Sequence, residues 1–443
     1  MSEIAAEVTD LLQGLIRNGC INDGTPGSGQ EIRNAELLAA HLHGCGLEIE
    51  TFEPVAGRTS LLAKLEGTDP SAPALMLMGH TDVVPVDADG WQRDPLGGEL
   101  VDGVVWGRGA IDMLNLTAAM AVATRRLAAS GRRPRGSLLF LAVADEEAGG
   151  ALGAGWLAEH ATDAIRCDYV ITENGGVLQH TPAGERIGIT VGEKGICWRR
   201  VIVHGTPGHG SRPLHSDNAV VKAAEVVTRL SGYRTAAHIT DAWRRWVAGM
   251  GFQPEVATAL VDPARIWEGI DALPRALAGM AHALTHLTVS PNVIRGGEKT
   301  NVIPGRVELE IDIRKVPGQS DEDVLEFFDT ALGPLRNDVT IEVIQRDDPS
   351  ESPADTPLWD AITRAATAVY PEATCIPTLT PGGTDARFFR AMGIPAYGMA
   401  LYSRDMSLEQ FSAMFHANDE RVDQESLRLT AELYGAVAKA LLG

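Results

Sequence analysis

Short apolar runs that stop at polar side chains recur through the first part of the chain. Residues 76–79, 137–144 and 168–172 are three such runs, and each is followed directly by a histidine or an acidic residue. Runs of this length, separated by stretches of helical spacing such as residues 113–130, predict buried strands alternating with helices. That alternation predicts a largely parallel sheet, whose strand ends lie at one edge. We therefore expect the polar side chains to converge there.

The middle of the chain has a different pattern. Residues 306–314 alternate strictly between apolar and polar side chains, as expected for an antiparallel sheet with one face on a core and the other in solvent. Strands over 188–191 and 196–203 and a helix over 218–230 come before it. The sequence predicts an α/β fold in which a mostly parallel sheet is flanked by helices, with an α+β part built on an antiparallel sheet.

His80 and Asp82 end the first apolar run. Residues two apart in a strand face the same way, so both side chains point out of the edge of the sheet. A carboxylate beside a histidine commonly holds a metal-binding imidazole in one tautomer. A polar pair that simply caps the strand end is the alternative.

More carboxylates follow at comparable positions. Asp145, Glu146 and Glu147 end the second run, and three adjacent carboxylates repel one another unless a cation or solvent compensates them. Glu173 ends the third run. Asp112 stands just before the helical stretch 113–130, where it could cap the helix, bind a metal, or do both.

The charge of the chain excludes one class of partner. Lys+Arg 38 against Asp+Glu 59 gives a net charge of -21, so no nucleic-acid partner is expected. The N-terminus has no basic stretch followed by an apolar core, and no segment reaches the ~18 apolar residues of a membrane span. We expect a cytoplasmic protein with no membrane contact. The five cysteines are scattered without a C-x-x-C pair, which favours reduced thiols over disulfides or a thiolate metal site.

A histidine near the C-terminus brings the number of candidate metal ligands to five: His80, Asp112, Glu147, Glu173 and His416. A mixed set of imidazoles and carboxylates suits Zn²⁺, Mn²⁺ or Co²⁺. Five groups are more than one catalytic ion needs, whereas two ions that share a carboxylate use them all. We expect two divalent metal ions per chain, with zinc first and cobalt or manganese as alternatives.

A series of short motifs extends over nearly the whole chain: Gly79-His-Thr-Asp82, Gly107-Arg-Gly-Ala-Ile-Asp112, Ala144-Asp-Glu-Glu147, Thr172-Glu173, Gly208-His209-Gly-Ser-Arg-Pro, Asn301-Val-Ile-Pro304, Asp312-Ile-Arg314, Gly382-Gly-Thr-Asp385 and His416. Their identity and order resemble those of the M20 metallopeptidases, which include aminoacylases, carboxypeptidases, dipeptidases and desuccinylases. The resemblance implies that Asp112 bridges two ions, that His80 and Glu173 complete one, and that Glu147 and His416 complete the other.

The same resemblance implies roles for two more carboxylates. Asp82 would orient His80, and Glu146 would be the general base that acts on a water between the two ions. Independently of the resemblance, a hydrolase needs one carboxylate that the metals do not consume, to take a proton from water and return it to the departing amine.

In the family an inserted lid domain divides the catalytic domain in two. The resemblance places catalytic parts at 1–191 and 317–443 and the lid at 192–316, and it leaves open a homodimer through the lid. His209 corresponds to a lid histidine that steadies the substrate carbonyl oxygen, in some relatives from the other subunit. From the residues alone, His209 is a surface loop histidine.

The segment 231–287 is an insertion in the lid. It contains Trp243 and Trp246, which lie three residues apart on an expected helix and could line an acyl pocket or pack the extra helices against each other.

Arg314 limits the substrate class. A guanidinium binds a carboxylate through two parallel hydrogen bonds, and in relatives an Arg at this motif, together with an Asn like Asn301, holds a free carboxylate. A surface pair between Arg314 and Asp312 is the alternative. Gly383 would allow the backbone to approach the ligand, and Asp385 would contact an amino group.

We therefore expect a metal-dependent hydrolase that cleaves an amide or peptide bond next to a free carboxylate of a small molecule, of the N-acyl amino acid hydrolase or carboxypeptidase type. A dipeptidase or a succinyl-diaminopimelate desuccinylase is the alternative among enzymes. A catalytically silent ligand-binding member is the alternative from another class.

Overall fold

The computed structural model describes residues 2–443, which divide into two compact units. The first unit comprises the residues up to Val191 together with Ser352–Thr378 and Thr384–Gly443. The second unit comprises Gly192–Glu351 and Leu379–Gly383. Among residues 2–443, none of the helices combines the length and the apolar character needed to cross a membrane.

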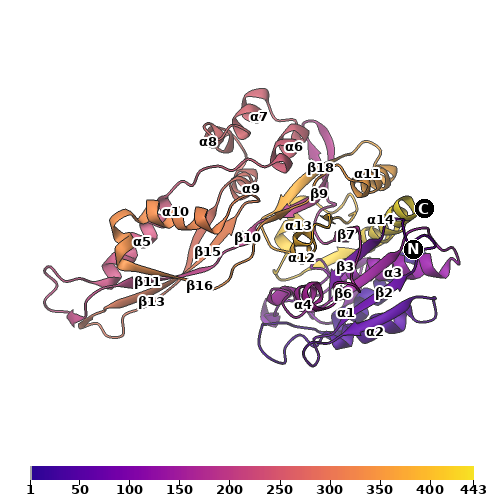
Figure 1. The fold of residues 1–443 in the computed structure, drawn as a ribbon, viewed down its shortest axis with the longest axis horizontal. Helices are drawn as coiled ribbons and strands as arrows, with labels where there is room; N and C mark the ends of the chain where they lie inside the picture. The colour runs from indigo at the N-terminus through magenta and orange to yellow at the C-terminus, as the bar shows by residue number, and fades with distance from the viewer. Residues whose placement is uncertain (1) are drawn as a thin grey trace. The chain divides into compact units, whose positions relative to one another are not determined.

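A mixed sheet forms the centre of the first unit (Figure 1). In sheet order its strands are β1 (Glu48–Phe52), β2 (Ser60–Leu65), β6 (Leu138–Val143), β3 (Leu75–His80), β7 (Tyr169–Thr172), β19 (Ala396–Gly398) and β9 (Gly184–Glu193), and β8 (Leu178–Thr181) and β18 (Thr374–Thr380) also pair with β9. The central strands β6, β3, β7 and β19 run parallel to one another, whereas β1, β2 and β9 pair antiparallel with their neighbours. The apolar runs of β3 and β6 are buried throughout, as expected for strands covered on both faces.

Helices cover both faces of this sheet. On one face, α3 packs on β3 and β6, and α1, α2 and α14 pack against α3. On the opposite face, the short helices α4 and α12 pack on Met76 and Met78 of β3. The predicted α/β fold, with a largely parallel central sheet flanked by helices, is confirmed. The first layer contains α1 (Glu3–Asn18), α2 (Ile32–Leu42), α3 (Leu114–Ala129) and α14 (Gln424–Leu442), the second α4 (Ala154–His160) and α12 (Ala386–Ala391), and the unit also has α11 (Pro357–Val369) and α13 (Leu408–Met414).

A small antiparallel sheet in the first unit joins two distant parts of the chain. It contains β4 (Glu99–Val101), β5 (Val104–Trp106) and β20 (Arg421–Asp423), and Arg421 pairs with Trp106. The loop after β5 and the loop before β20 therefore lie beside each other.

The second unit is built on an antiparallel sheet with helices on one face. Its strands are β13 (Thr288–Gly296), β10 (Gly195–Ile196), β15 (Arg306–Lys315), β11 (Arg199–His204) and β16 (Val339–Val343). The apolar side chains of β15 alternate with polar ones and face a core that β11, α5 (Ala219–Gly232) and α10 (Asp321–Leu332) share. The predicted alternation is thus present. The unit contains the expected segment 192–316 and continues to Glu351, because α10 and β16 pack into the same sheet and core.

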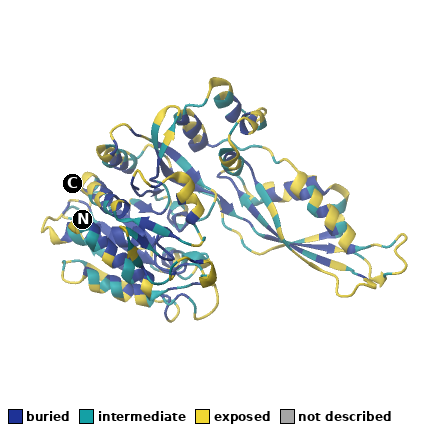
Figure 2. Ribbon diagram, turned by 180° about the vertical axis from the view of Figure 1, so that it is seen from behind, coloured by how far each residue is buried: buried dark blue, intermediate teal, exposed yellow. Residues whose placement is uncertain are grey.

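Short helices form the insertion of the second unit: α6 (Asp241–Met250), α7 (Pro254–Leu260), α8 (Ile266–Asp271) and α9 (Arg275–Thr285). Trp243 and Trp246 stack with their ring centroids 4.8 Å apart, and both are buried. The indole N–H of Trp243 donates to the carbonyl of Leu260 at 2.8 Å. These contacts indicate that the two tryptophans pack the short helices against one another. Figure 2 shows that the central strands of the first unit are buried, and that the covering helices of both units have exposed outer faces. The short strand β17 (Ser350–Glu351) pairs with Gly192 and Glu193 at the end of β9, and the remaining short strands, β12 (Gly208–His209) and β14 (Val302–Ile303), pair with each other.

The close contact between β3 and α3 provides a test of the fold. A Cβ added at Gly79 would lie 3.1 Å from Cε of Met113 and 3.3 Å from Cα of Thr117, whose hydroxyl donates to the His80 carbonyl. Gly79→Ala should therefore destabilise the protein by roughly 1–3 kcal/mol through overpacking. Gly435→Ala is the matched control, because Gly435 lies in α14 with no atom within 4 Å of an added Cβ; that change should raise stability by up to about 1 kcal/mol. Thermal unfolding of both variants checks the opposite signs, and equal effects would contradict the packing described.

Candidate active site

His80 ends β3 at the edge where the parallel strands finish. The register pairs His80 with Val143 of β6 and Leu77 with Ile171 of β7, so the residues after β6 and β7 start beside His80. The His80 imidazole is buried, and its Nδ1 lies 3.0 Å from the Asp82 carbonyl and 3.5 Å from the Asp82 carboxylate. Of the two contacts with Asp82, the one to its backbone carbonyl is therefore the shorter. The other ring nitrogen of His80, Nε2, points toward the remaining site residues.

Asp112 lies at the meeting point of two groups of side chains. Its Oδ1 is 3.2 Å from Nε2 of His80, and its Oδ2 is 3.2 Å from Nε2 of His416. Helix α3 begins at Leu114 with Met113 as its N-cap residue and without a capping side chain, so Asp112 does not cap the helix. Its carboxylate is directed to the two histidines.

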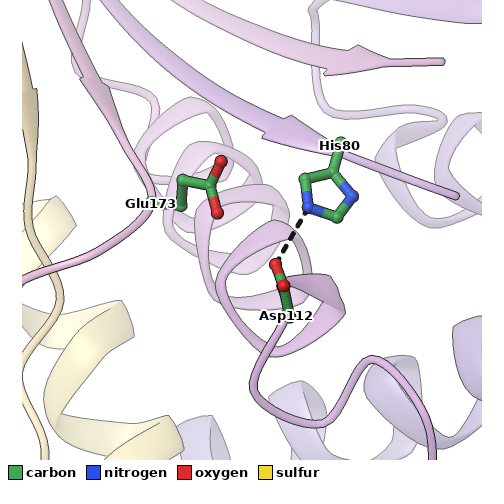
Figure 3. Close-up of side chains that lie close together, drawn as sticks. All are labelled: His80, Asp112 and Glu173. Atoms are coloured by element: carbon green, nitrogen blue, oxygen red, sulfur yellow. Dashed lines mark hydrogen bonds and ion pairs between the residues drawn. The ribbon is translucent and has the colours of Figure 1, made fainter. Parts of the chain in front are cut away.

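The five predicted ligands form two clusters that share Asp112. Ligand atoms of His80, Asp112 and Glu173 lie within 4.8 Å of one another, and so do those of Asp112, Glu147 and His416. Figure 3 shows the imidazole of His80 and the carboxylates of Asp112 and Glu173 pointing toward one another. In the second cluster, Oε2 of Glu147 is 3.3 Å from Nε2 of His416. The structure thus brings all five residues together within the first unit.

The carboxylates of the site differ in how their surroundings act on negative charge. Burial disfavours the charge of Asp112, yet hydrogen bonds to His416 and His80 lower its pKa. Burial, together with the charge of Asp112, raises the pKa of Glu173 well above its usual range and raises that of Glu147 as well. Hydrogen bonds to Asp112 and Glu147 raise the pKa of His416 to about 10. Burial opposes charge on His80, yet hydrogen bonds to Asp112 and Asp82 raise its pKa well above the usual value. Cationic imidazoles therefore balance part of the negative charge in this arrangement.

Glu146 is next to the second cluster but belongs to neither. It begins a single 3₁₀ turn, Glu146–Ala148, directly after Asp145. Burial and the neighbouring charge of Glu173 raise its pKa well above the usual range. A carboxyl with a raised pKa that is not part of a ligand cluster suits proton transfer.

A buried network that the sequence analysis did not assign holds the loop of Glu146 and Glu147. Asp145 has a positive φ of 73°, and its carboxylate pairs with Arg58 and accepts a hydrogen bond from the Leu152 N–H at 2.8 Å. The Asn22 amide donates to Asp82 at 2.8 Å and to Asp145 at 3.3 Å, and Asp82 also accepts from the Glu147 N–H at 3.1 Å. No short motif links these residues, because Asn22 and Arg58 lie 123 and 87 positions from Asp145.

Asp385 is the remaining predicted site residue of the first unit. Its side chain is buried, and neither carboxylate oxygen has a hydrogen-bond partner among residues 2–443. Burial raises the pKa of Asp385 to about 7. Such an unpaired carboxyl can accept hydrogen bonds from a ligand.

The other predicted residues lie in the second unit. His209 is exposed in β12, its Nδ1 lies 2.7 Å from the Ser211 hydroxyl, and β12 pairs with β14 next to Asn301. Arg314 donates to both carboxylate oxygens of Asp312, at 2.7 and 3.1 Å, so the pair considered as the alternative is present. Gly383 ends the segment Leu379–Gly383 of the same unit.

Comparison with known proteins agrees with this geometry. Residues 76–440 match the model of peptidase family M20/M25/M40. The chain is 27% identical to aminoacylase-1 of Mus musculus over 430 residues, covering 95% of this chain and 92% of that protein. It is 28% identical to succinyl-diaminopimelate desuccinylase of Gluconacetobacter diazotrophicus over 448 residues, covering 98% and 96%. The crystal structure of an M20 family metallo-carboxypeptidase from Sulfolobus solfataricus superposes with a TM-score of 0.74 at 19% identity, covering 100% of this chain and 99% of that one.

The family match covers most of the chain, and it agrees with the motifs and fold described above. This chain belongs to peptidase family M20/M25/M40 and is a metal-dependent hydrolase of the M20 type.

Proposed function

We propose that this enzyme is a two-metal hydrolase that cleaves an amide or peptide bond next to a free carboxylate, in the manner of an N-acyl amino acid hydrolase or a carboxypeptidase. The observation that carries the proposal is the position of Asp112. Its two carboxylate oxygens face different imidazoles at the same distance, 3.2 Å, and Asp112 is a member of both clusters of ligand atoms.

The chemistry of the two clusters fits a pair of divalent ions. Both combine imidazole nitrogen with carboxylate oxygen and contain no thiolate, a donor set that suits Zn²⁺, Mn²⁺ or Co²⁺. Oε1 of Glu147 is buried and has no hydrogen-bond partner among residues 2–443. His80 and Glu173 would hold one ion, Glu147 and His416 the other, and Asp112 both. Cations would compensate the buried carboxylates whose pKa values are raised.

Glu146 would perform the proton transfers. Two divalent cations, when bound, lower the pKa of water toward neutrality and polarise the scissile carbonyl. Glu146, outside both clusters, would accept a proton from the attacking water and return it to the nitrogen of the leaving amine. The N–H of Ala148 in the short turn Glu146–Ala148 donates to the Asp145 carbonyl at 3.2 Å, and this turn would fix the position from which Glu146 acts. Asp82 would keep the His80 ring in one orientation through the contact at Nδ1.

The remaining predicted residues would contact the substrate. Arg314 and Asn301 would bind the free carboxylate, His209 would steady the carbonyl oxygen, and Gly383 would let the backbone approach the ligand. Asp385 of the first unit would accept hydrogen bonds from an amino group. The names of the two relatives compared above, an aminoacylase and a desuccinylase, both fit an N-acyl amino acid as substrate.

Three readings compete with this proposal. A dipeptidase or a desuccinylase would use the same metal centre on a different substrate. A catalytically silent ligand-binding protein would not need Glu146, whereas this chain has Glu146 beside two clusters of potential ligand atoms. A homodimer through the second unit and a cytoplasmic location remain predictions of the sequence.

The substrate class can be tested by amine release. We expect the Zn²⁺- or Mn²⁺-loaded enzyme to release the amine from N-acyl amino acids, in a panel that also contains dipeptides and N-succinyl-diaminopimelate. Chelation should abolish the reaction, and returning the metal should restore it. Preferred turnover of dipeptides or of the succinyl substrate would select one of the enzymatic alternatives. Two bound metals with no turnover of any compound would favour the silent role.

The division of roles between two adjacent glutamates is a second prediction. Glu146→Gln should lower kcat roughly 10²–10⁴-fold, the usual contribution of general acid–base catalysis, while two metals remain bound. Glu147→Gln, its matched control one residue away, should lower the metal content. Metal analysis and kinetics on the same samples check both variants, and metal loss from Glu146→Gln would show that the assignments are exchanged.

Recognition of the free carboxylate can be tested at Arg314. Arg314→Met should lower kcat/KM for the best substrate by about ten- to a hundredfold, because a hydrogen bond to a charged group contributes about 1.5–3 kcal/mol. The carboxamide analogue of that substrate should be affected much less. Arg306→Met is the control, since Arg306 lies on the same strand and pairs with Glu308 at 2.8 Å. An equal loss for both substrates would assign Arg314 to structure alone.

A further inference from the structure

The side chain of Glu420 is fully buried, and its carboxylate accepts hydrogen bonds from the backbone of the loop that contains Asp112. Its Oε1 accepts hydrogen bonds from the N–H groups of Ile111 and Asp112, at 2.6 and 2.7 Å. Its Oε2 accepts from the N–H of Gly109 at 3.0 Å and from the guanidinium of Arg108 at 3.0 Å. Both oxygens are therefore occupied by donors, and Glu420 is not available as a metal ligand.

Arg108 connects the same carboxylate to the loop of His416. Its guanidinium donates to the carbonyl of Ala417 at 2.9 Å and to that of His416 at 3.4 Å. His416 has a positive φ of 56°, which few residues with a side chain adopt without support from their surroundings. The Gly107 N–H donates to the Glu420 carbonyl at 3.0 Å, where β5 and β20 begin to pair.

These contacts tie together two ligand candidates that lie far apart in the chain. Asp112 and His416 face each other at 3.2 Å, and their loops are connected by the small sheet and by the pair of Arg108 and Glu420. The side chains of that pair are 3% and 0% exposed, so water does not replace the hydrogen bonds. In Glu420→Gln the side chain would lose its charge and one acceptor oxygen. Three N–H groups and a guanidinium would then compete for the single amide oxygen.

We propose that Glu420, acting with Arg108, is a positioning residue for the Asp112–Glu147–His416 cluster, and that it sets the metal affinity of this cluster more than that of the His80–Asp112–Glu173 cluster. The proposal rests on the two-metal function given above. The asymmetry follows from the contacts, because His416 belongs to the second cluster alone, whereas His80 and Glu173 are held by β3 and the end of β7.

The test is a titration of the metal-free full-length protein with Zn²⁺ against a chromophoric chelator. We expect wild type to bind two ions. In Glu420→Gln, one ion should bind with nearly unchanged affinity and the other about 10–100-fold more weakly, the range seen when the partner of a metal ligand is removed. Arg108→Lys keeps the positive charge and all three backbone bonds to Glu420 but cannot hold both carbonyls, so it should weaken the same ion to a smaller extent. Arg108→Lys also tests the proposal if Glu420→Gln fails to fold.

Asp423→Ala is the control for a general loss of stability, because Ala, unlike Asn, cannot accept the capping hydrogen bond. Asp423 caps α14 three residues after Glu420: its carboxylate accepts from the Ser426 N–H at 2.8 Å and from the hydroxyls of Ser403 and Ser426, and none of these donors belongs to the loops of Asp112 and His416. This variant should unfold at a lower temperature with unchanged affinity for both ions. If Glu420→Gln and Arg108→Lys also bind two ions as wild type does, the positioning role is refuted while the two-metal function stands. If wild type itself does not bind two ions, both proposals fail.

Discussion

The carboxylate of Asp112, placed between two imidazoles, is the interaction on which the candidate site depends. Its oxygens lie 3.2 Å from His80 and 3.2 Å from His416, and the other carboxylates gather around these three groups. Burying so many acids in one place is unfavourable, as the raised pKa values of Glu146, Glu147 and Glu173 indicate. Cationic imidazoles offset part of that cost in the protein alone, and bound cations would offset it more fully.

The parallel centre of the sheet makes this arrangement possible. Because β3 pairs in parallel with both β6 and β7, the residues after each strand emerge at the same edge. The register matters as much as the direction, since a slip of one residue would turn His80 away from the site. Around these strand ends, buried polar contacts such as the pair of Arg58 and Asp145 fix loops that secondary structure does not reach.

The sequence predicted those parts of the site that depend on local pattern. Apolar runs ending in His80, Glu147 and Glu173 indicated strands whose ends converge, and the structure places these residues within the two clusters. Asp112 and His416 entered through donor type and family resemblance, because neither lies at the end of such a strand. Glu420 and Arg108 were not predicted, since a contact across 312 positions leaves no signal in spacing. Burial and register, which decide these contacts, arise only when the whole unit has folded.

The contact between Arg314 and Asp312 determines which donors of the guanidinium are already in use. Nε and one Nη of Arg314 donate to Asp312, at 2.7 and 3.1 Å, on strand β15. A guanidinium carries five N–H donors, so the others could bind a substrate carboxylate while the pair with Asp312 stays intact. A neutral group at the same place would form only an ordinary hydrogen bond, which contributes less to binding than one between charged partners. Arg314 would therefore favour substrates with a free carboxylate over their neutral analogues.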